Sequence, residues 1–166
     1  MDKDTKKLNL GCGKKILEGY TNVDLNPKAD VVCDITKLPK EWTEQYDEAM
    51  AIHVIEHIYP WDVEQTLLEW KRVLKPGGKL ILECPDLIKV SLLFLKDPNV
   101  VRLGMWGFYG DNRSKDPLMC HKWGYTPKSL ETLLRAAGFD QIKHMKAQYH
   151  LPERDMRIEA IKWPGG

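Results

Sequence analysis

Short hydrophobic runs alternate along this chain with segments whose apolar residues recur at helical spacing. Four runs are rich in strand-forming residues: Lys7–Leu10, Tyr20–Asp24, Ala29–Cys33 and a run that ends near Ile52. A fifth run, Lys79–Glu83, follows the first helical segment. Strands that alternate with helices are typical of a parallel sheet flanked by helices, so the pattern predicts an α/β fold.

Hydrophobic periodicity predicts two helices. The first lies between Trp61 and Leu74, and the breakers of Lys75-Pro76-Gly77-Gly78 end it. The second begins at Thr126, whose hydroxyl can cap free amides, and ends at Gly138. Its core-facing residues are expected to be Leu130, Leu133, Leu134 and Ala137.

The last part of the chain holds two further β-prone stretches. These are Gln141–Tyr149 and Met156–Trp163, and they predict an antiparallel hairpin at the sheet edge. With 166 residues, the chain has the size of a single domain with one core, so residues 1–166 are expected to form one domain.

Composition removes several classes of protein. The 25 basic and 24 acidic residues nearly balance, so there is no strong signal for nucleic-acid binding. No apolar run approaches a membrane span, and the charged start lacks the apolar core of a secretion signal. The four cysteines show no Cys-x-x-Cys pair and are expected to be reduced thiols. We therefore expect a cytoplasmic protein without a membrane partner.

The most informative motif is the run Leu8-Asn9-Leu10-Gly11-Cys12-Gly13, which Asp24 follows eleven positions after Gly13. An apolar segment that stops at two glycines suits a buried strand whose backbone turns sharply and approaches a ligand closely. A carboxylate that closes the next strand suits a ribose diol. Together these residues predict a nucleoside pocket at the carboxyl ends of adjacent parallel strands.

The ordered set of motifs resembles the class I S-adenosylmethionine-dependent methyltransferases over nearly the whole chain. The set comprises Asn9-Leu10-Gly11-Cys12-Gly13, Val23-Asp24-Leu25, Cys33-Asp34-Ile35, Ile52-His53-Val54-Ile55-Glu56-His57-Ile58, Trp70–Leu80 and Leu133–Phe139. The resemblance implies a Rossmann-like, seven-stranded, mostly parallel sheet with helices on both faces and one inserted antiparallel strand. It also implies S-adenosylmethionine as cofactor, bound over the ends of the first four strands.

The resemblance assigns roles to individual residues. Gly11 and Gly13 would let backbone amides approach the methionine part of the cofactor, Asp24 would accept both ribose hydroxyls, and Asp34 would accept the adenine amino group. His53 and Val54 would lie beside the adenine or ribose. The full expected cofactor-binding set is Asn9, Leu10, Gly11, Cys12, Gly13, Asp24, Leu25, Asp34, Ile35, His53 and Val54. For each position a purely structural role remains the alternative, such as a tight turn or a packed side chain.

The chain departs from the family pattern in two places. Between Gly13 and Asp24 there is no room for a full crossover helix, so the first crossover is expected to be shortened. Position 16 is Ile rather than a third glycine, which argues against a nicotinamide cofactor. The second departure is Asn9, which stands where many relatives carry an acid that helps to hold the methionine amino group.

The segment His53-Val54-Ile55-Glu56-His57 also spells the His-x-x-Glu-His pattern of one class of zinc peptidases. That chemistry needs both histidines on one helix face, whereas Met50-Ala51-Ile52 is strand-like and Pro60 follows closely. The methyltransferase pattern accounts for the same residues, so no metal site is expected.

Methyl transfer chiefly requires alignment of the acceptor, and a hydroxyl acceptor also needs a base. His57 and His121 are the candidate bases, and Tyr125 is a candidate for orienting the acceptor. For all three, a partly buried polar side chain with a structural role is the alternative.

The insert around residues 87–122 is expected to act as a substrate lid because it holds aromatic residues between glycines. It could equally pack against a second subunit, so a homodimer through this insert is also expected. The main hypothesis is a methyltransferase that acts on a small-molecule acceptor, such as a saccharide or another biosynthetic intermediate. The alternative is a non-catalytic cofactor-binding or scaffold protein that keeps the methyltransferase fold.

Overall fold

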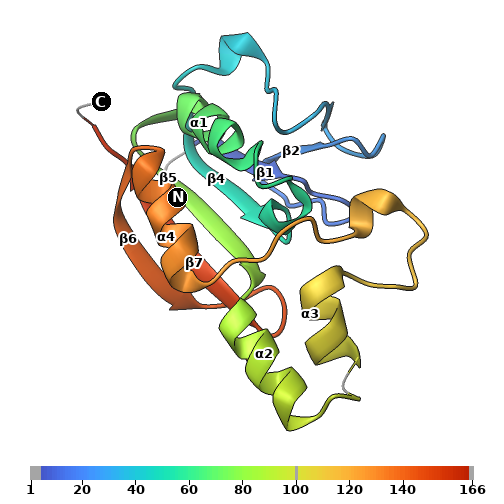
Figure 1. Ribbon diagram of the computed structural model, residues 1–166. Helices are drawn as coiled ribbons and strands as arrows, with labels where there is room; N and C mark the ends of the chain where they lie inside the picture. The colour runs from blue at the N-terminus through green and yellow to red at the C-terminus, as the bar shows by residue number, and fades with distance from the viewer. Residues whose placement is uncertain (1–4, 100, 165–166) are drawn as a thin grey trace.

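The computed structural model describes residues 5–99 and 101–164, and its centre is one seven-stranded sheet with the order β3-β2-β1-β4-β5-β7-β6 (Figure 1). Adjacent strands are parallel except around β7, which is antiparallel to both of its neighbours. This arrangement confirms the Rossmann-like, mostly parallel sheet and the terminal hairpin. The strands are β1 (Lys7–Leu10), β2 (Thr21–Asp24), β3 (Val31–Val32), β4 (Tyr46–Ile52), β5 (Leu74–Pro85), β6 (Phe139–Lys146) and β7 (Asp155–Lys162).

All four α-helices follow the strand β4 along the chain. The helical elements are α1 (Val63–Val73), α2 (Leu87–Lys96), α3 (Trp106–Tyr109), α4 (Pro127–Ala136), the 3-10 turns η1 (Lys40–Trp42), η2 (Ile55–His57) and η4 (Pro117–Met119), and the π-helical η3 (Val101–Met105). None of the helices in the described ranges is long and apolar enough to cross a membrane.

Thr126 caps the start of α4, as the sequence predicts, and the structure adds Ser129 as the second member of a capping box. The Thr126 hydroxyl accepts a hydrogen bond from the Ser129 amide at 3.1 Å, and the Ser129 hydroxyl accepts one from the Thr126 amide at 2.9 Å. Gly138 follows the helix with φ +85°, a left-handed conformation that favours glycine. The helix ends are therefore set by local chemistry.

The strand β5 begins earlier than the sequence predicts. The first helix ends at Val73, and Leu74 already pairs with Tyr46 of β4 before a shift of register. The breakers Gly77 and Gly78 therefore lie in an irregular part of β5 rather than in a separate loop. Tertiary pairing has extended the strand across residues that would interrupt it in isolation.

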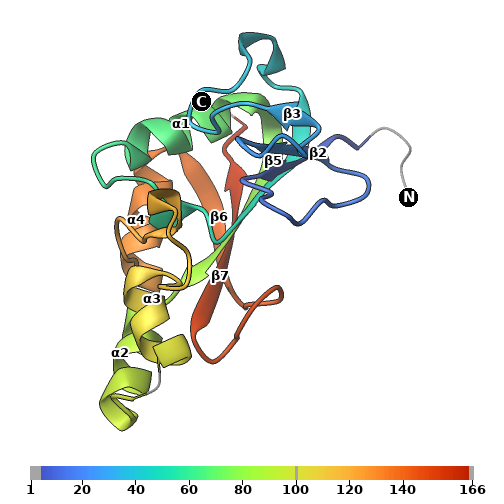
Figure 2. The same cartoon turned by 90° about the vertical axis from the view of Figure 1, so that its right-hand side faces the viewer.

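The helices α1 and α4 both pack on the same face of the sheet (Figures 1 and 2). Between them and the strands lies the main core, and its largest fully buried side chains include Leu8, Leu10, Leu67, Trp70, Leu80, Leu82, Leu130 and Leu134. The Trp70 indole also donates a hydrogen bond to the Ile35 carbonyl at 2.9 Å. The core thereby holds the segment after β3 in place.

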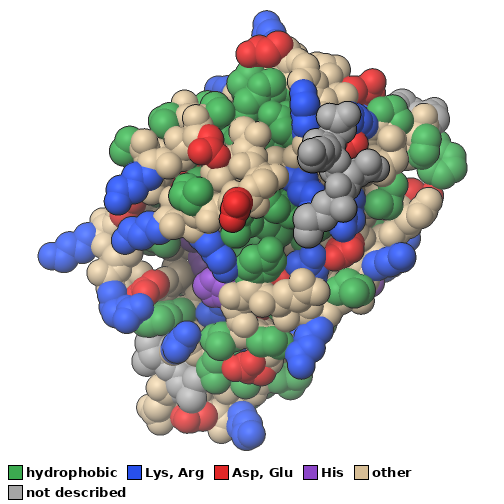
Figure 3. Space-filling model, turned by 180° about the vertical axis from the view of Figure 1, so that it is seen from behind, with side chains coloured by type: hydrophobic (Ala, Val, Ile, Leu, Met, Phe, Trp, Pro, Cys, Tyr) green, Lys and Arg blue, Asp and Glu red, His purple; other side chains and the backbone are tan. Residues whose placement is uncertain are grey.

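Among the described residues, no helix lies on the other face of the sheet (Figure 2). The connections before β2 and before β3 are too short to contain one. This face instead carries side chains of both charges (Figure 3). Its ion pairs are Lys7–Glu48, Lys79–Glu48, Lys79–Glu159, Arg157–Glu83 and Arg157–Glu159.

The expected shortened crossover between β1 and β2 is present, and buried asparagines hold it. Asn9 Nδ2 donates to the Lys15 carbonyl and to Asn22 Oδ1, both at 2.9 Å. Asn22 Oδ1 also accepts from the Leu17 amide at 2.8 Å. These contacts replace the backbone hydrogen bonds that a crossover helix would have supplied.

The insert of residues 87–122 forms a small helical layer at the carboxyl ends of the strands. Gly107 of α3 lies so close to Val90 of α2 that a Cβ atom there would stand 2.6 Å from Val90 Cγ2. Phe94 and Phe108 add an edge-to-face contact with ring centroids 6.0 Å apart. The homodimer expected through this insert stays a prediction.

Candidate active site

Two cavities lie side by side at the carboxyl ends of the parallel strands. In an open α/β sheet a ligand binds where the strand order reverses, which in this sheet is between β1 and β4. The first cavity, of about 370 Å³, is there and is called the cofactor cavity below. Its lining is Gly11, Gly13, Asp24, Leu25, Cys33, Asp34, Ile35, Thr36, His53, Val54, His57, Ile58, Asp116, Leu118 and Met119.

The two glycines after β1 have different structural roles. Both have left-handed backbones, with φ +67° at Gly11 and φ +54° at Gly13. A Cβ atom at Gly11 would stand 2.6 Å from Val54 Cγ2, whereas one at Gly13 would meet no protein atom within 4 Å. Gly11 therefore permits the contact with β4, and Gly13 leaves open the space that a ligand would occupy.

Asp24 lies at the end of β2 with its carboxylate at the cofactor cavity. Its Oδ2 accepts a hydrogen bond from the Gly13 amide at 2.7 Å, and its Oδ1 accepts one from the Asn26 amide at 2.8 Å. Each carboxylate oxygen keeps a further acceptor position. Asp24 thus orders the glycine turn and can still accept from a ribose hydroxyl.

The segment after β3 supplies another side of the cavity. Asp34 Oδ1 accepts from the amide and the hydroxyl of Thr36, at 2.8 and 2.7 Å. Leu25 is 59% exposed and Ile35 is half-buried, so both present apolar surface to a ligand. These positions suit an adenine ring between apolar side chains.

Three residues of the expected cofactor set do not line either cavity. Asn9 is buried with its amide committed to Lys15 and Asn22, and Leu10 is fully buried in the core. Cys12 is 5% exposed, and burial, together with the charge of Asp24, raises the pKa of its thiol. The Asn9 amide nitrogen therefore helps to hold the crossover loop, and a contact of Asn9 with the methionine amino group stays a prediction.

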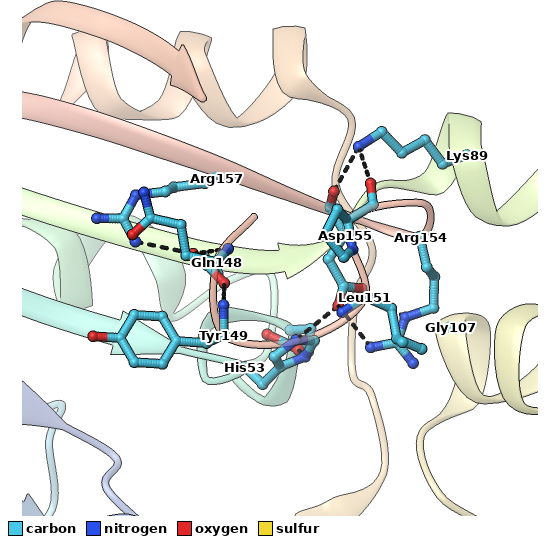
Figure 4. A network of polar contacts seen from close by, with 12 residues as sticks. His53, Lys89, Gly107, Gln148, Tyr149, Leu151, Arg154, Asp155 and Arg157 are labelled. Atoms are coloured by element: carbon cyan, nitrogen blue, oxygen red, sulfur yellow. Dashed lines mark hydrogen bonds and ion pairs between the residues drawn. The ribbon is translucent and has the colours of Figure 1, made fainter. Parts of the chain in front are cut away.

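His53 stands at the end of β4 with φ +55° and contacts two acidic side chains. Its Nδ1 is 2.9 Å from Glu56 Oε1, and its Nε2 is 3.2 Å from Asp155 Oδ2 (Figure 4). Burial lowers the pKa of His53, but the hydrogen bonds to Asp155 and Glu56 outweigh it and raise the pKa to about 9. His53 is therefore a buried imidazolium at neutral pH.

Asp155 is the second centre of this network. It is fully buried, and Arg154 donates to it from Nε at 2.6 Å and from Nη2 at 2.9 Å. Lys89 of α2 donates to the Asp155 carbonyl at 2.6 Å, which ties the insert to β7 (Figure 4). The network thus fixes the loop before β7 against the end of β4.

The second cavity, of about 480 Å³, lies under the insert and is called the acceptor cavity below. Both volumes fall within the range of about 300–1,000 Å³ that is usual for small-molecule sites. The acceptor cavity is lined by His53, His57, Arg102, Trp106, Gly110, Asp111, Arg113, Met119, His121, His150, Leu151 and Arg154. His53, His57 and Met119 line both cavities, so the two spaces adjoin.

The three expected catalytic residues have different positions. His57 lines both cavities, and His121 lines the acceptor cavity. Tyr125 is 1% exposed and lines neither cavity, and its hydroxyl has no hydrogen-bond partner among the described residues. Its placement does not suit direct contact with an acceptor.

Four basic residues of the acceptor cavity, Arg102, Arg113, His150 and Arg154, were not identified from the sequence. Arg102 and Arg113 come from the insert, and His150 and Arg154 come from the loop before β7. These residues have no motif spacing, and only the fold brings the two segments together. The single available signal was the position of the insert after the fifth strand.

Comparison with known proteins agrees with this architecture. A family model described as "Methyltransferase domain" matches residues 8–82. A search of curated proteins found no match. Residues 8–82 are therefore similar to a methyltransferase domain, and S-adenosylmethionine is the cofactor of that family.

Solved structures with similar folds include several methyltransferases. The Burkholderia thailandensis 1,6-didemethyltoxoflavin-N1-methyltransferase, with bound 1,6-didemethyltoxoflavin and S-adenosylhomocysteine, has a TM-score of 0.67 at 17% identity, and the match covers 95% of this chain and 71% of that one. A Methanosarcina mazei S-adenosylmethionine-dependent methyltransferase has a TM-score of 0.67 at 18% identity, with 98% and 94% covered. One from Archaeoglobus fulgidus has a TM-score of 0.62 at 18% identity, with 95% and 86% covered. At these identities the likeness is one of fold.

Proposed function

We propose that this chain transfers a methyl group from S-adenosylmethionine to a small molecule bound in the acceptor cavity. The observation that carries the proposal is the shared wall of the two cavities, formed by His53, His57 and Met119. A donor in one cavity and an acceptor in the other would meet at this wall. Such juxtaposition supplies the alignment that methyl transfer needs.

The residues of the cofactor cavity fit S-adenosylmethionine. Gly13 leaves space open, Asp24 keeps acceptor positions for the ribose, and Asp34 has one oxygen, Oδ2, without a hydrogen bond among the described residues. We propose these three residues, with Gly11, Leu25, Ile35, His53 and Val54, as the cofactor-binding set. When bound, the cofactor supplies an electrophilic methyl group.

The charges of the acceptor cavity favour an anionic acceptor, such as a carboxylate or a phosphate ester. Arg113 is paired with Asp111, and Arg154 is paired with Asp155. Arg102 forms no ion pair within the described parts of the chain, and it is exposed at the cavity. Arginine is well suited to a planar anion because its guanidinium can donate two parallel hydrogen bonds.

His57 and His121 are the proposed contacts to the reacting part of the acceptor. Burial lowers the pKa of His121, which keeps its imidazole neutral and able to accept a hydrogen bond or a proton. The insert is proposed to exclude water, since Trp106 and Gly110 border the acceptor cavity and Leu118 borders the cofactor cavity.

Isothermal titration with S-adenosylhomocysteine tests the donor half of the proposal. We expect saturable binding at one site, and Asp24→Ala should weaken it by about 10–150-fold, since hydrogen bonds to charged groups contribute about 1.5–3 kcal/mol. Asp97→Ala, an exposed carboxylate outside both cavities, is the matched control and should bind as the wild type does.

Failure to bind S-adenosylhomocysteine by well-folded protein would overturn the proposal and favour a scaffold role. If binding is present, a library of carboxylated and phosphorylated small molecules is screened for release of S-adenosylhomocysteine. Arg102→Ala should then raise KM for the anionic acceptor without changing the affinity for S-adenosylhomocysteine.

A further inference from the structure

Two groups of histidine and carboxylate side chains place their ligand atoms within 4.8 Å of one another. One group is His53, His150 and Asp155, and the other is Glu56, His57 and His121. The first group is already satisfied, because both ring nitrogens of His53 contact carboxylates and both oxygens of Asp155 contact Arg154. The second group has free ligand atoms.

Glu56 carries the clearest sign of an unfilled partner. Its side chain is 1% exposed, and Oε1 contacts His53, whereas Oε2 has no hydrogen-bond partner among the described residues. A buried carboxylate oxygen without a donor is costly unless a cation or a water satisfies it.

The two imidazoles are oriented with one ring nitrogen free. His57 Nδ1 lies 3.2 Å from the Cys120 carbonyl, and His121 Nδ1 lies 3.1 Å from the Gly107 carbonyl. A carbonyl only accepts, so each Nδ1 carries the hydrogen, and in the neutral ring each Nε2 keeps its lone pair. A carbonyl behind the ring is the usual way in which proteins orient a metal-binding histidine.

Backbone contacts preorganise the three side chains. The Glu56 carbonyl accepts from the amides of Lys122 and Trp123, at 2.7 and 3.2 Å. These bonds fasten the end of the insert onto η2, so that the rings of His57 and His121 lie with centroids 4.9 Å apart. The cluster is therefore held by structure far apart in the sequence.

We propose that Glu56 Oε2, His57 Nε2 and His121 Nε2 bind one divalent transition-metal ion at the wall between the two cavities. Bonds of about 2.1 Å in a tetrahedral site put ligand atoms about 3.4 Å apart, and the ligand atoms of this cluster already lie within 4.8 Å of one another. Two imidazoles and one carboxylate suit ions of the zinc, iron or cobalt type and leave positions open for a substrate.

The site differs from the peptidase pattern in the same segment. That pattern would pair His53 with His57, but η2 is a single 3-10 turn and His53 is engaged by Glu56 and Asp155. The expectation from sequence that no metal binds considered only this local spacing. The structure adds His121, which the local spacing does not contain.

A role for the ion in catalysis rests on the proposed function, whereas its binding does not. His57 and His121 line the acceptor cavity, so an ion held by them would be accessible from that cavity. An acceptor hydroxyl bound to the ion would release its proton to solvent more readily, as metal-bound water does. Its oxygen would then form a bond to the methyl carbon while the carbon–sulfur bond breaks with its electron pair left on sulfur.

The test uses untagged full-length protein that has been treated with a chelator and dialysed, without S-adenosylmethionine. We expect titration with Co²⁺ to produce a visible absorption band that saturates at one equivalent of the ion. Zn²⁺ should displace the Co²⁺ and abolish the band. Substitution of a residue that only hydrogen-bonds to a metal ligand lowers metal affinity by about 10–100-fold. Substitution of a ligand itself should cost at least as much, so Glu56→Gln and His121→Ala should each weaken Co²⁺ binding by about 100-fold or more. His144→Ala, an exposed histidine of β6 bonded to Glu131, should bind Co²⁺ as the wild type does.

Absence of a stoichiometric band in folded protein would overturn the site, as would equal Co²⁺ affinity in Glu56→Gln and the wild type. A water would then be the partner of Glu56 Oε2. The parallel titration with S-adenosylhomocysteine separates the two proposals, because none of the three metal ligands belongs to the proposed cofactor-binding set. Metal binding without S-adenosylhomocysteine binding would sink the proposed function alone, and the reverse result would sink the metal site alone.

Discussion

Alanine substitutions at the two glycines of the cofactor turn should differ in kind: Gly11→Ala should mainly lower stability, and Gly13→Ala should mainly weaken cofactor binding. Both residues have positive φ, but their surroundings differ. A Cβ atom at Gly11 would stand 2.6 Å from Val54 Cγ2 inside the protein, whereas one at Gly13 would project into the open cofactor cavity. Gly11→Ala is therefore a packing mutation, and Gly13→Ala is a ligand-exclusion mutation.

The magnitudes follow from these contacts. A left-handed alanine costs about 1–2 kcal/mol at either position. Overpacking adds about 1–3 kcal/mol at Gly11, because Val54 is buried and must move. We expect the free energy of unfolding to fall by about 2–5 kcal/mol in Gly11→Ala and by only about 1–2 kcal/mol in Gly13→Ala.

Urea unfolding measures the stability of each variant, and calorimetric titration measures its affinity for S-adenosylhomocysteine. Gly13→Ala should lose affinity beyond its small loss of stability, since the new methyl group occupies ligand space. In the double variant Gly11→Ala/Val54→Ala the clash is relieved, so the two changes should be coupled by about 1 kcal/mol or more. Equal stability losses at the two glycines, or unchanged affinity in Gly13→Ala, would refute the reasoning.

The remaining predictions concern stability. Asp155→Asn should lower the free energy of unfolding by about 3 kcal/mol at neutral pH, because it breaks a buried ion pair with Arg154 and leaves His53 with one acidic partner. Burial raises the pKa of Asp155, but hydrogen bonds from His53 and Arg154 outweigh it and hold the pKa well below the usual value. The stabilisation by ionised Asp155 is complete above its unfolded-state pKa of about 3.9 and is lost as the pH falls toward the folded-state pKa. The gap between wild type and Asp155→Asn, measured by urea unfolding, should therefore narrow from about pH 5 to about pH 2, and a constant gap would contradict this account. Thr126→Ala should cost about 1 kcal/mol by removing the cap of α4, and thermal unfolding that matches the wild type would contradict the capping box.

Local chemistry in the sequence determined much of the fold. The strand β1, the helix start at Thr126 and the turn at Gly138 depend on residues within a few positions, and the structure has each of them where the sequence predicts it. The glycine turn and Asp24 also act together, since Asp24 accepts a hydrogen bond from Gly13. Such features can be read from one segment because their partners lie in that segment or in the neighbouring strand.

Only the tertiary structure decided which way several side chains point. Asn9 matches a cofactor position in sequence, yet the crossover is so short that Asn9 is needed to satisfy the backbone of Lys15. The short connections before β2 and before β3 leave one face of the sheet without a helix among the described residues. Ion pairs between side chains of neighbouring strands lie on that face. Periodicity within a strand shows that two faces differ, but it does not show what covers each face.

The candidate metal cluster shows most clearly what the local sequence predicts and what only tertiary packing decides. The sequence by itself determined that Glu56 and His57 follow the fourth strand, and it marked both histidines, His57 and His121, as candidates for chemistry. It did not bring His121 to Glu56, because that contact depends on backbone hydrogen bonds between η2 and the end of a long insert. Short-range pattern fixes which residues are available, whereas long-range packing fixes which of them meet.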